Sequence, residues 1–303
     1  MRVLVAGSSG VVGQQVMPVL EGAGHEAIGL TSRPPTQDPR YRNVVADALD
    51  QAALNDVVAN VRPDAVVHLM TAIPQRINPR QMRTEFLLTN RLRTEGTRNL
   101  IGAATAAGVS RLITQGLAYA YRPGQGLADE ETPLWTEAPA QFQSSIGALQ
   151  ELERRTVDAG GLVLRFGHLY GPRTTFAKGG AFRKDIEQGK LPLVGGGHAV
   201  YSFTHTRDAA MGILSALDSA ASGALNIVDD DPAPMHEWLP ELAQQLGARA
   251  PRAIPAWVAR MAVGGWGVAF MSKLRGANNA RARLALDWRP GYESWRDGFA
   301  AEL

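Results

Sequence analysis

Three glycines at regular spacing follow the first apolar run of the chain. The run covers residues 3–5, and Gly7, Gly10 and Gly13 come directly before a helical pattern. Glycine permits the tight turn from strand to helix, lets a pyrophosphate approach the backbone, and lets the helix pack closely on the sheet. A strand before this G-x-x-G-x-x-G spacing and a helix from residue 11 to about 22 after it predict a dinucleotide-binding turn. A glycine-rich turn without a ligand is the alternative.

The end of the second expected strand indicates which dinucleotide is bound. An NAD site typically has a carboxylate there, about 20 residues beyond the glycine turn, to accept hydrogen bonds from the ribose hydroxyls. This chain has Thr31, Ser32 and Arg33 instead. Two hydroxyls and a guanidinium suit a 2′-phosphate, so the sequence favours NADP, with NAD as the other option. If Arg33 only begins a solvated loop, this preference has no basis.

Three residues are candidates for proton transfer. Tyr119 and Tyr121 follow the fifth expected strand, and His168 follows the sixth. Ligands bind at such strand ends in open parallel sheets. A phenol can donate a hydrogen bond to a carbonyl, and an imidazole exchanges protons near neutrality. Packed or solvated tyrosines and a structural histidine are the alternatives.

Apolar runs bounded by turn residues alternate with longer amphipathic stretches, which is typical of an α/β protein with a doubly wound, Rossmann-like parallel sheet. We expect a dinucleotide-binding domain at residues 1–165, with returning segments at about 200–228, and a smaller C-terminal substrate lobe at 166–303. Helices are expected near 85–107 and 144–158. The expected strands are residues 2–5, 26–30, 43–45, 65–69, 111–114 and 162–165.

Composition excludes several classes of protein. The 303 residues include no cysteine, so disulfides and thiolate metal sites are excluded, and the six histidines show no metal-ligand spacing. The net charge is only +2 and the arginines are dispersed, which argues against nucleic acid as a partner. The first residues read as a strand and not as a signal peptide, so a cytoplasmic protein is expected.

Aromatic side chains are frequent in the C-terminal part. Residues 253–271 are the most apolar stretch, but Pro255 and Arg260 interrupt it, so we expect a buried or lid helix and no membrane span. The aromatic set favours an apolar or aromatic substrate, although the same residues suit a core. Arg173, Lys178 and Arg183 could hold an anionic substrate or form a solvated rim. The aromatic residues are Trp238, Trp257, Trp266 and Phe270, and Met271 directly follows Phe270.

The glycine turn and a series of later motifs together resemble the extended short-chain dehydrogenase/reductase family, whose members are NAD(P)-dependent epimerases, dehydratases and reductases. The resemblance covers nearly the whole chain and depends on the order of the motifs. These are Asp47, His68-Leu69, Asn90 with Gly96-Thr97, Leu164-Arg165, Tyr170-Gly171-Pro172, the run from Phe203 to Asp208, and Asn226-Ile227-Val228.

The resemblance implies a set of contacts to the cofactor. Asp47 would lie beside the adenine, and residues 70–72 would pass the nicotinamide ribose. It also implies a homodimer formed through the helices near 85–107 and 144–158. The expected cofactor-binding residues are Gly7, Ser9, Gly10, Val11, Val12, Gly13, Thr31, Ser32, Arg33, Asp47, Ala48, Leu69, Met70, Thr71, Asn90 and Thr114.

The chain departs from this family at its catalytic pair. Relatives use a tyrosine and a lysine in Y-x-x-x-K, because the lysine lowers the pKa of the phenol that passes a proton. Here the two positions fall at Ser145 and Leu149, and no Tyr or Lys occurs between Gly126 and Arg165. The family's Ser or Thr falls at Gly116 or Leu117, which leaves Thr114 upstream.

These observations predict an atypical NADP(H)-dependent reductase or epimerase that acts on a small carbonyl metabolite, with Tyr119, Tyr121 or His168 stabilising the developing oxyanion. The missing pair keeps two alternatives open. One is a non-redox isomerase or cyclase that retains the nucleotide as a structural element. The other is a cofactor-sensing binding protein without catalysis.

Overall fold

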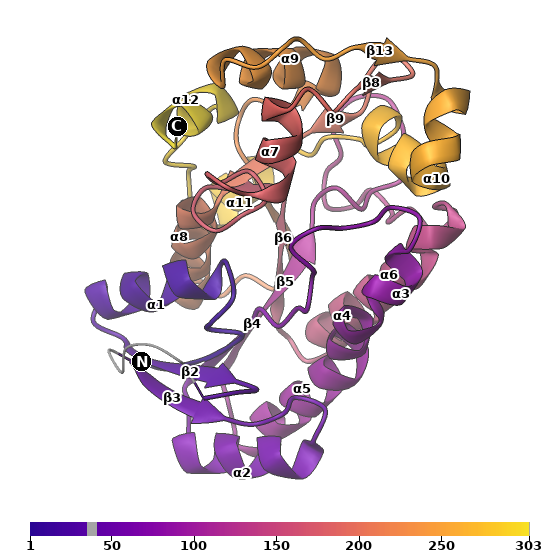
Figure 1. Ribbon diagram of the computed structural model, residues 1–303. Helices are drawn as coiled ribbons and strands as arrows, with labels where there is room; N and C mark the ends of the chain where they lie inside the picture. Colours follow the sequence, from indigo (N-terminus) through magenta and orange to yellow (C-terminus); the bar gives the residue numbers. More distant parts are fainter. Residues whose placement is uncertain (35–40, 303) are drawn as a thin grey trace.

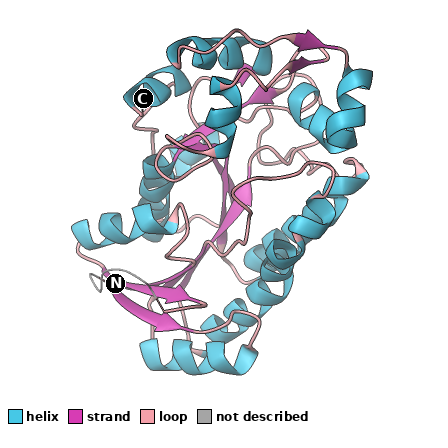
Figure 2. Cartoon of the chain, viewed as in Figure 1, coloured by secondary structure: helices cyan, strands magenta, loops and turns pink. Residues whose placement is uncertain are grey.

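The computed structural model describes residues 1–34 and 41–302, and within them the central sheet has seven parallel strands (Figures 1 and 2). Their order across the sheet is β11-β6-β5-β4-β1-β2-β3. This order confirms the doubly wound, Rossmann-like α/β fold. The strands are β1 (Arg2–Ala6), β2 (Glu26–Thr31), β3 (Arg42–Val45), β4 (Ala65–His68), β5 (Arg111–Leu117), β6 (Leu162–Phe166) and β11 (Gly223–Ile227).

Helices cover both faces of the sheet because successive strand residues point to opposite sides. In β1, Val3 and Val5 enter the core cluster beneath α1 (Gly13–Gly22) and α8 (Thr206–Leu217). Leu4 and Ala6 enter the cluster on the other face. The helices there are α2 (Gln51–Val61), α5 (Thr97–Ala106) and α6 (Ala140–Asp158).

The strand order reverses between β1 and β4. Chain connections from these two neighbours leave in opposite directions, so their carboxyl ends border an open crevice where ligands bind in such sheets. The glycine turn follows β1, and residues 69–72 follow β4. The sheet therefore places the predicted nucleotide residues of both segments at one edge.

The helix expected near residues 85–107 is divided into four pieces. These are α3 (Met82–Glu85), α4 (Leu87–Arg91), the π-helical turn η1 (Leu92–Gly96) and α5. A π-helical turn inside an α-helix shifts the faces of the residues on either side of it and is frequent at functional sites. Both α4 and η1 pack against α6.

The C-terminal part has its own core, which continues from the end of β5. Its small sheets pair β7 (His168–Tyr170) with β10 (Phe203–His205), β8 (Leu193–Val194) with β13 (Ala253–Ile254), and β9 (Val200–Tyr201) with β12 (Ala233–Pro234). The helices are α7 (Ala181–Glu187), α9 (Met235–Gln245), α10 (Ala256–Ser272), α11 (Ala280–Leu286) and α12 (Trp295–Ala301). In Figure 1, α7, α9 and α10 lie beyond the carboxyl ends of the sheet strands, so they face the crevice edge.

The most apolar stretch forms α10, which is broken inside. Gly264 has φ of +71°, a conformation that favours glycine, so the helix bends there. In the described part of the chain, no helix has the length and apolar character needed to cross a membrane.

Candidate active site

Two of the three glycines in the turn, Gly7 and Gly13, are packed too closely for any larger residue. Gly7 has φ of +92°, and a Cβ there would lie 2.9 Å from the carbonyl carbon of Leu69. A Cβ on Gly13 would lie 2.3 Å from the carbonyl oxygen of Gly7, because α1 begins against the turn. A Cβ on Gly10 would meet only the Gly7 carbonyl oxygen, at 3.1 Å, and is otherwise open. This closely packed turn with an open outer face fits the pyrophosphate of a dinucleotide.

The residues predicted to distinguish NADP from NAD lie beside this turn. The Thr31 hydroxyl donates to the Arg33 carbonyl oxygen at 2.6 Å, so it fixes the bend after β2 and is not itself free. Ser32 and Arg33 are exposed. Asp47 is also exposed and accepts a hydrogen bond from the Leu49 amide at 2.9 Å. Ser32, Arg33 and Asp47 are thus available to a ligand.

His68 holds the loop after β4 in place. Its Nδ1 accepts a hydrogen bond from the Met70 amide at 3.1 Å, and its Nε2 lies 2.8 Å from the Thr97 hydroxyl. Burial, together with the nearby Arg93 cation, lowers the pKa of His68 to about 4. His68 is therefore neutral near pH 7, and it fixes the course of Leu69 and Met70, with Thr71 exposed beyond them.

Two other predicted cofactor residues lie deeper in the protein. Thr114 is fully buried in β5, and its hydroxyl lies 3.0 Å from that of Thr156 on α6. Asn90 on α4 donates weakly to the Ser144 hydroxyl at 3.4 Å, while its Oδ1 is buried and has no described partner. Thr114 pairs with His68, the last residue of β4, so it lies level with the carboxyl end of that strand, but its hydroxyl contacts α6.

Tyr119 and His168 lie together. Their rings stack with centroids 4.5 Å apart, and the Tyr201 ring stacks on the His168 ring at 4.0 Å. Burial lowers the pKa of His168 to about 3, so this imidazole is neutral near pH 7. The Tyr119 hydroxyl has no hydrogen-bond partner among the described residues, which leaves it free for a ligand.

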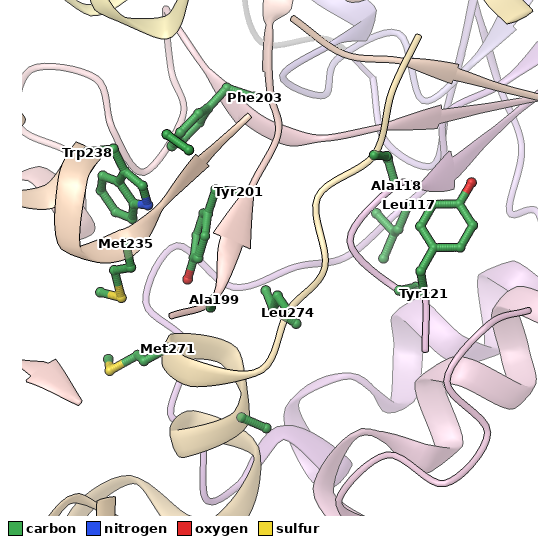
Figure 3. Close-up of a cluster of buried hydrophobic side chains, with 14 of the residues drawn as sticks. Leu117, Ala118, Tyr121, Ala199, Tyr201, Phe203, Met235, Trp238, Met271 and Leu274 are labelled. Atoms are coloured by element: carbon green, nitrogen blue, oxygen red, sulfur yellow. The ribbon is translucent and has the colours of Figure 1, made fainter. Parts of the chain in front are cut away.

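Tyr121 belongs to a different network. Its hydroxyl donates to Asn226 Oδ1 at 2.6 Å and accepts from Arg165 Nη1 at 2.8 Å. Arg165 in turn forms an ion pair with Glu153 at 2.6 Å. Burial raises the pKa of Tyr121 to about 12. The Tyr121 hydroxyl is thus occupied by this network. In Figure 3 its ring lies apart from Tyr201, the ring that stacks on His168.

An aromatic wall extends from this stack to α10. Phe270 contacts the His168 and Tyr201 rings edge-on, each with centroids 5.5 Å apart, and the Tyr201 hydroxyl donates to the Phe270 carbonyl oxygen. Trp266 lies 5.9 Å from Phe270 and stacks on Phe142 of α6 at 3.8 Å. Of the aromatic residues predicted to line a pocket, Trp238 is fully buried in the core and Trp257 is 69% exposed.

Sequence reasoning missed Arg93. It is only 3% exposed and lies in η1, opposite α6, where Ser145 and Leu149 stand at the positions of the family's tyrosine and lysine. A signal was present: Phe86, Thr89, Arg93, Thr97 and Leu100 recur at helical spacing and are all buried. An arginine on the apolar face of that helix predicts a buried cation.

The chain belongs to the family described as the NAD dependent epimerase/dehydratase family, which matches residues 3–228. It is 44% identical over 309 residues to a Streptomyces 3-diazoavenalumate denitrifying reductase, and the match covers 100% of both chains. It is 27% identical over 264 residues to a 2-alkyl-3-oxoalkanoate reductase of Stenotrophomonas maltophilia, covering 82% of this chain and 76% of that protein.

The fold agrees with solved structures. The human epimerase family protein SDR39U1, solved with NADPH, superposes with a TM-score of 0.75 at 22% identity, over 100% of this chain and 99% of that one. Family and relatives together show an NAD(P)-dependent oxidoreductase-like enzyme that acts on a small molecule. The cofactor class is a nicotinamide dinucleotide.

Proposed function

We propose that this enzyme is a reductase that reduces a small aromatic molecule lying between the glycine turn and the aromatic wall, where Tyr119 and Phe270 are half-buried and His168 and Trp266 support them from the core. The observation that carries this proposal is the aromatic site at the carboxyl ends of β5 and β6, where the tyrosine and lysine positions hold Ser145 and Leu149. A reduced nicotinamide, when bound, supplies a hydride. The chain's own residues orient the substrate ring by stacking and exclude water from it.

The first candidate substrate is an aromatic diazo compound, the class named for the Streptomyces relative. When a hydride reaches the ring carbon that carries the diazo group, a C–H bond forms and the C–N bond breaks, with its electron pair leaving on N₂. In a diazotised phenol the ring oxygen becomes a phenolate. No proton has to be delivered during this step, so the reaction needs no Y-x-x-x-K pair.

The second candidate is the carbonyl metabolite expected from the sequence. Hydride addition to a carbonyl creates an alkoxide that needs a proton. Tyr119 is the residue placed for this, because its hydroxyl is unpaired among the described residues and the Arg93 cation opposes the rise in its pKa that burial causes. The Stenotrophomonas relative, a reductase of a 3-oxo acid by its name, favours this alternative.

NADP is the proposed cofactor. The exposed Ser32 and Arg33 would hold the 2′-phosphate, Asp47 the adenine, and Met70 and Thr71 the nicotinamide ribose. We also propose a cytoplasmic homodimer that pairs α4 and α6 across a two-fold axis. Exposed apolar side chains on these helices support it, namely Leu87, Leu88 and Val157.

The test uses diazotised 3-amino-4-hydroxybenzoate, a stable diazo phenol, with NADPH or NADH deuterated at C4. Enzyme-dependent N₂ release, with deuterium at the former diazo carbon, supports the first candidate. A 2-alkyl-3-oxo acid is offered in parallel, and its reduction without any action on the diazo compound favours the second. Cofactor oxidation with neither compound would overturn both substrate assignments, and product without deuterium would overturn hydride transfer.

A further inference from the structure

Arg93 is a buried cation without a counter-ion. It forms no hydrogen bond or ion pair with any residue in the part of the chain that the structure describes, and its Nη1 is completely enclosed. The other two arginines that are buried in residues 1–34 and 41–302 are paired: Arg165 with Glu153 at 2.6 Å and Arg183 with Glu187 at 2.9 Å. Arg93 therefore departs from the rule that buried charges are paired.

The surroundings of Arg93 are polar but uncharged. Tyr119 and His68 are its electrostatic neighbours. Three further polar side-chain atoms near this site are buried without a described partner. One belongs to His168 in the aromatic wall, and the other two belong to residues on α4 and α6, the helices that contact η1. They are Asn90 Oδ1, Ser145 Oγ and His168 Nε2.

An unpaired buried guanidinium cannot relieve its cost by losing its proton. Burial lowers the pKa of Arg93 only to about 10, so the group stays charged at neutral pH. A buried charge costs several kcal/mol unless an anion accompanies it. The pyrophosphate of a dinucleotide is already provided for at the glycine turn, at the N-terminus of α1. The missing anion must come from the other ligand of the site.

We propose that Arg93 binds an anionic oxygen of the substrate, a carboxylate or a phenolate, in a buried subsite completed by Asn90, Ser145 and Tyr119. This inference rests on the proposed function in one respect, since it places the ligand in the same aromatic site. It makes the substrate an aromatic anion and not merely an apolar molecule. It also explains why Ser145 stands in place of a tyrosine, because a small residue there leaves room for the anion.

Binding without turnover tests the subsite. Calorimetry of the full-length protein with oxidised NADP would compare cinnamate with cinnamamide, and 4-nitrophenolate with 4-nitroanisole. We expect the anion of at least one pair to bind about 10- to 100-fold more tightly than its neutral partner. The pair that discriminates identifies the anion as carboxylate or phenolate. Wild-type protein that prefers neither anion overturns the proposal.

Variants of Arg93 separate binding from a structural role. Arg93→Met should abolish the preference for the anion and leave the affinity for the neutral partner within about threefold, while Arg93→Lys should retain part of it. Arg91→Met is the matched control, because Arg91 lies two residues earlier on another face of the helix, is exposed and pairs with Glu95. A preference that survives Arg93→Met would contradict the proposal.

Thermal unfolding of the ligand-free protein gives a second readout. Removing an unpaired buried charge should leave the Tm of Arg93→Met equal to or above that of wild type. A Tm several degrees lower would assign Arg93 to folding and overturn its role as a binding residue. An anion preference without any cofactor oxidation would support this subsite and contradict the proposed reductase function. Hydride transfer without an anion preference would support the reductase function and contradict the subsite.

Discussion

Arg93 and Arg165 are both buried arginines near the same edge of the sheet, but their environments are opposite. Arg165 donates two hydrogen bonds to Glu153 and others to the Tyr121 hydroxyl and the Glu130 carbonyl oxygen. Arg93 has none of these among the described residues. A buried cation with protein partners on all sides, like Arg165, is part of the fold, whereas one without them, like Arg93, has its donors available to a ligand.

Breaking the Arg165 network should have the largest effect. Glu153→Ala leaves Arg165 buried and unpaired, so we expect the free energy of unfolding to fall by about 3–5 kcal/mol. Urea unfolding followed by circular dichroism measures it. Glu151→Ala is the control on the same helix, since its partly exposed pairs with Arg154 and Arg155 should contribute no more than about 1 kcal/mol. Equal losses in the two variants would mean that the Arg165 network is not structural.

Acid should lower the free energy of unfolding through two buried histidines near Arg93, namely His68 and His168. The pKa values of His68 and His168 are about 4 and about 3 in the folded protein, against 6.5 for a free histidine. Below pH 6.5 the unfolded chain therefore binds more protons than the native state. The free energy of unfolding falls as pH drops, by about 2 kcal/mol for each histidine at pH 5.

Arg93 modulates this loss through one of the two histidines. Burial is the larger cause of the low pKa of His68, and the Arg93 charge adds to it. Arg93→Met should raise the pKa of His68, so that the native state takes up its proton at a higher pH and the decline becomes flatter below about pH 5, while Arg91→Met should leave it as in wild type. Urea unfolding at several pH values checks both. An unchanged slope in Arg93→Met would show that the cation does not act on His68.

We expect Tyr121 to contribute to stability, as Arg165 does, and Tyr119 to act on the ligand, as proposed for Arg93. Tyr121→Phe removes hydrogen bonds to Asn226 and Arg165, so we expect a loss of about 1–2 kcal/mol in stability with turnover retained. Tyr119→Phe should leave stability within about 0.5 kcal/mol. It should lower the kcat of carbonyl reduction by at least about tenfold, because that reaction needs a proton. For N₂ release from a diazo phenol it should raise KM, since Tyr119 also belongs to the anion subsite, and leave kcat within about twofold. If Tyr121→Phe alone stops turnover, the roles are reversed.

The fold could be predicted from the sequence because its signals are local. Each strand expected in residues 1–165 is observed with ends that differ by at most three residues, since apolar runs and flanking turns define a buried parallel strand. The helix near 85–107 exists but includes the π-helical turn η1. That turn packs against α6, a helix more than forty residues further along the chain, and no local pattern of residues predicts it.

Within the candidate site, only the glycine turn has a clear signal in the sequence. At Gly7 and Gly13 a Cβ would lie within 3 Å of another backbone atom, so these positions require glycine and the requirement is visible in the sequence. The hydrogen-bond partner of a tyrosine or an arginine is not visible in this way, because Tyr121 donates to Asn226, which lies more than a hundred residues further along the chain. The same holds for Arg93, whose missing counter-ion becomes visible only after every neighbour is placed.

Arg33 is an exposed arginine and can be compared with the buried Arg93 and Arg165. Its guanidinium faces solvent beside the glycine turn, so a phosphate there would be screened and bound less strongly than in a buried site. Arg33→Ala should weaken NADPH binding by about tenfold and leave NADH binding unchanged. Arg42→Ala, an exposed arginine on β3, is the matched control and should change neither. Equal weakening of both cofactors by Arg33→Ala would place this side chain away from the 2′-phosphate, and the preference would then have to come from Ser32.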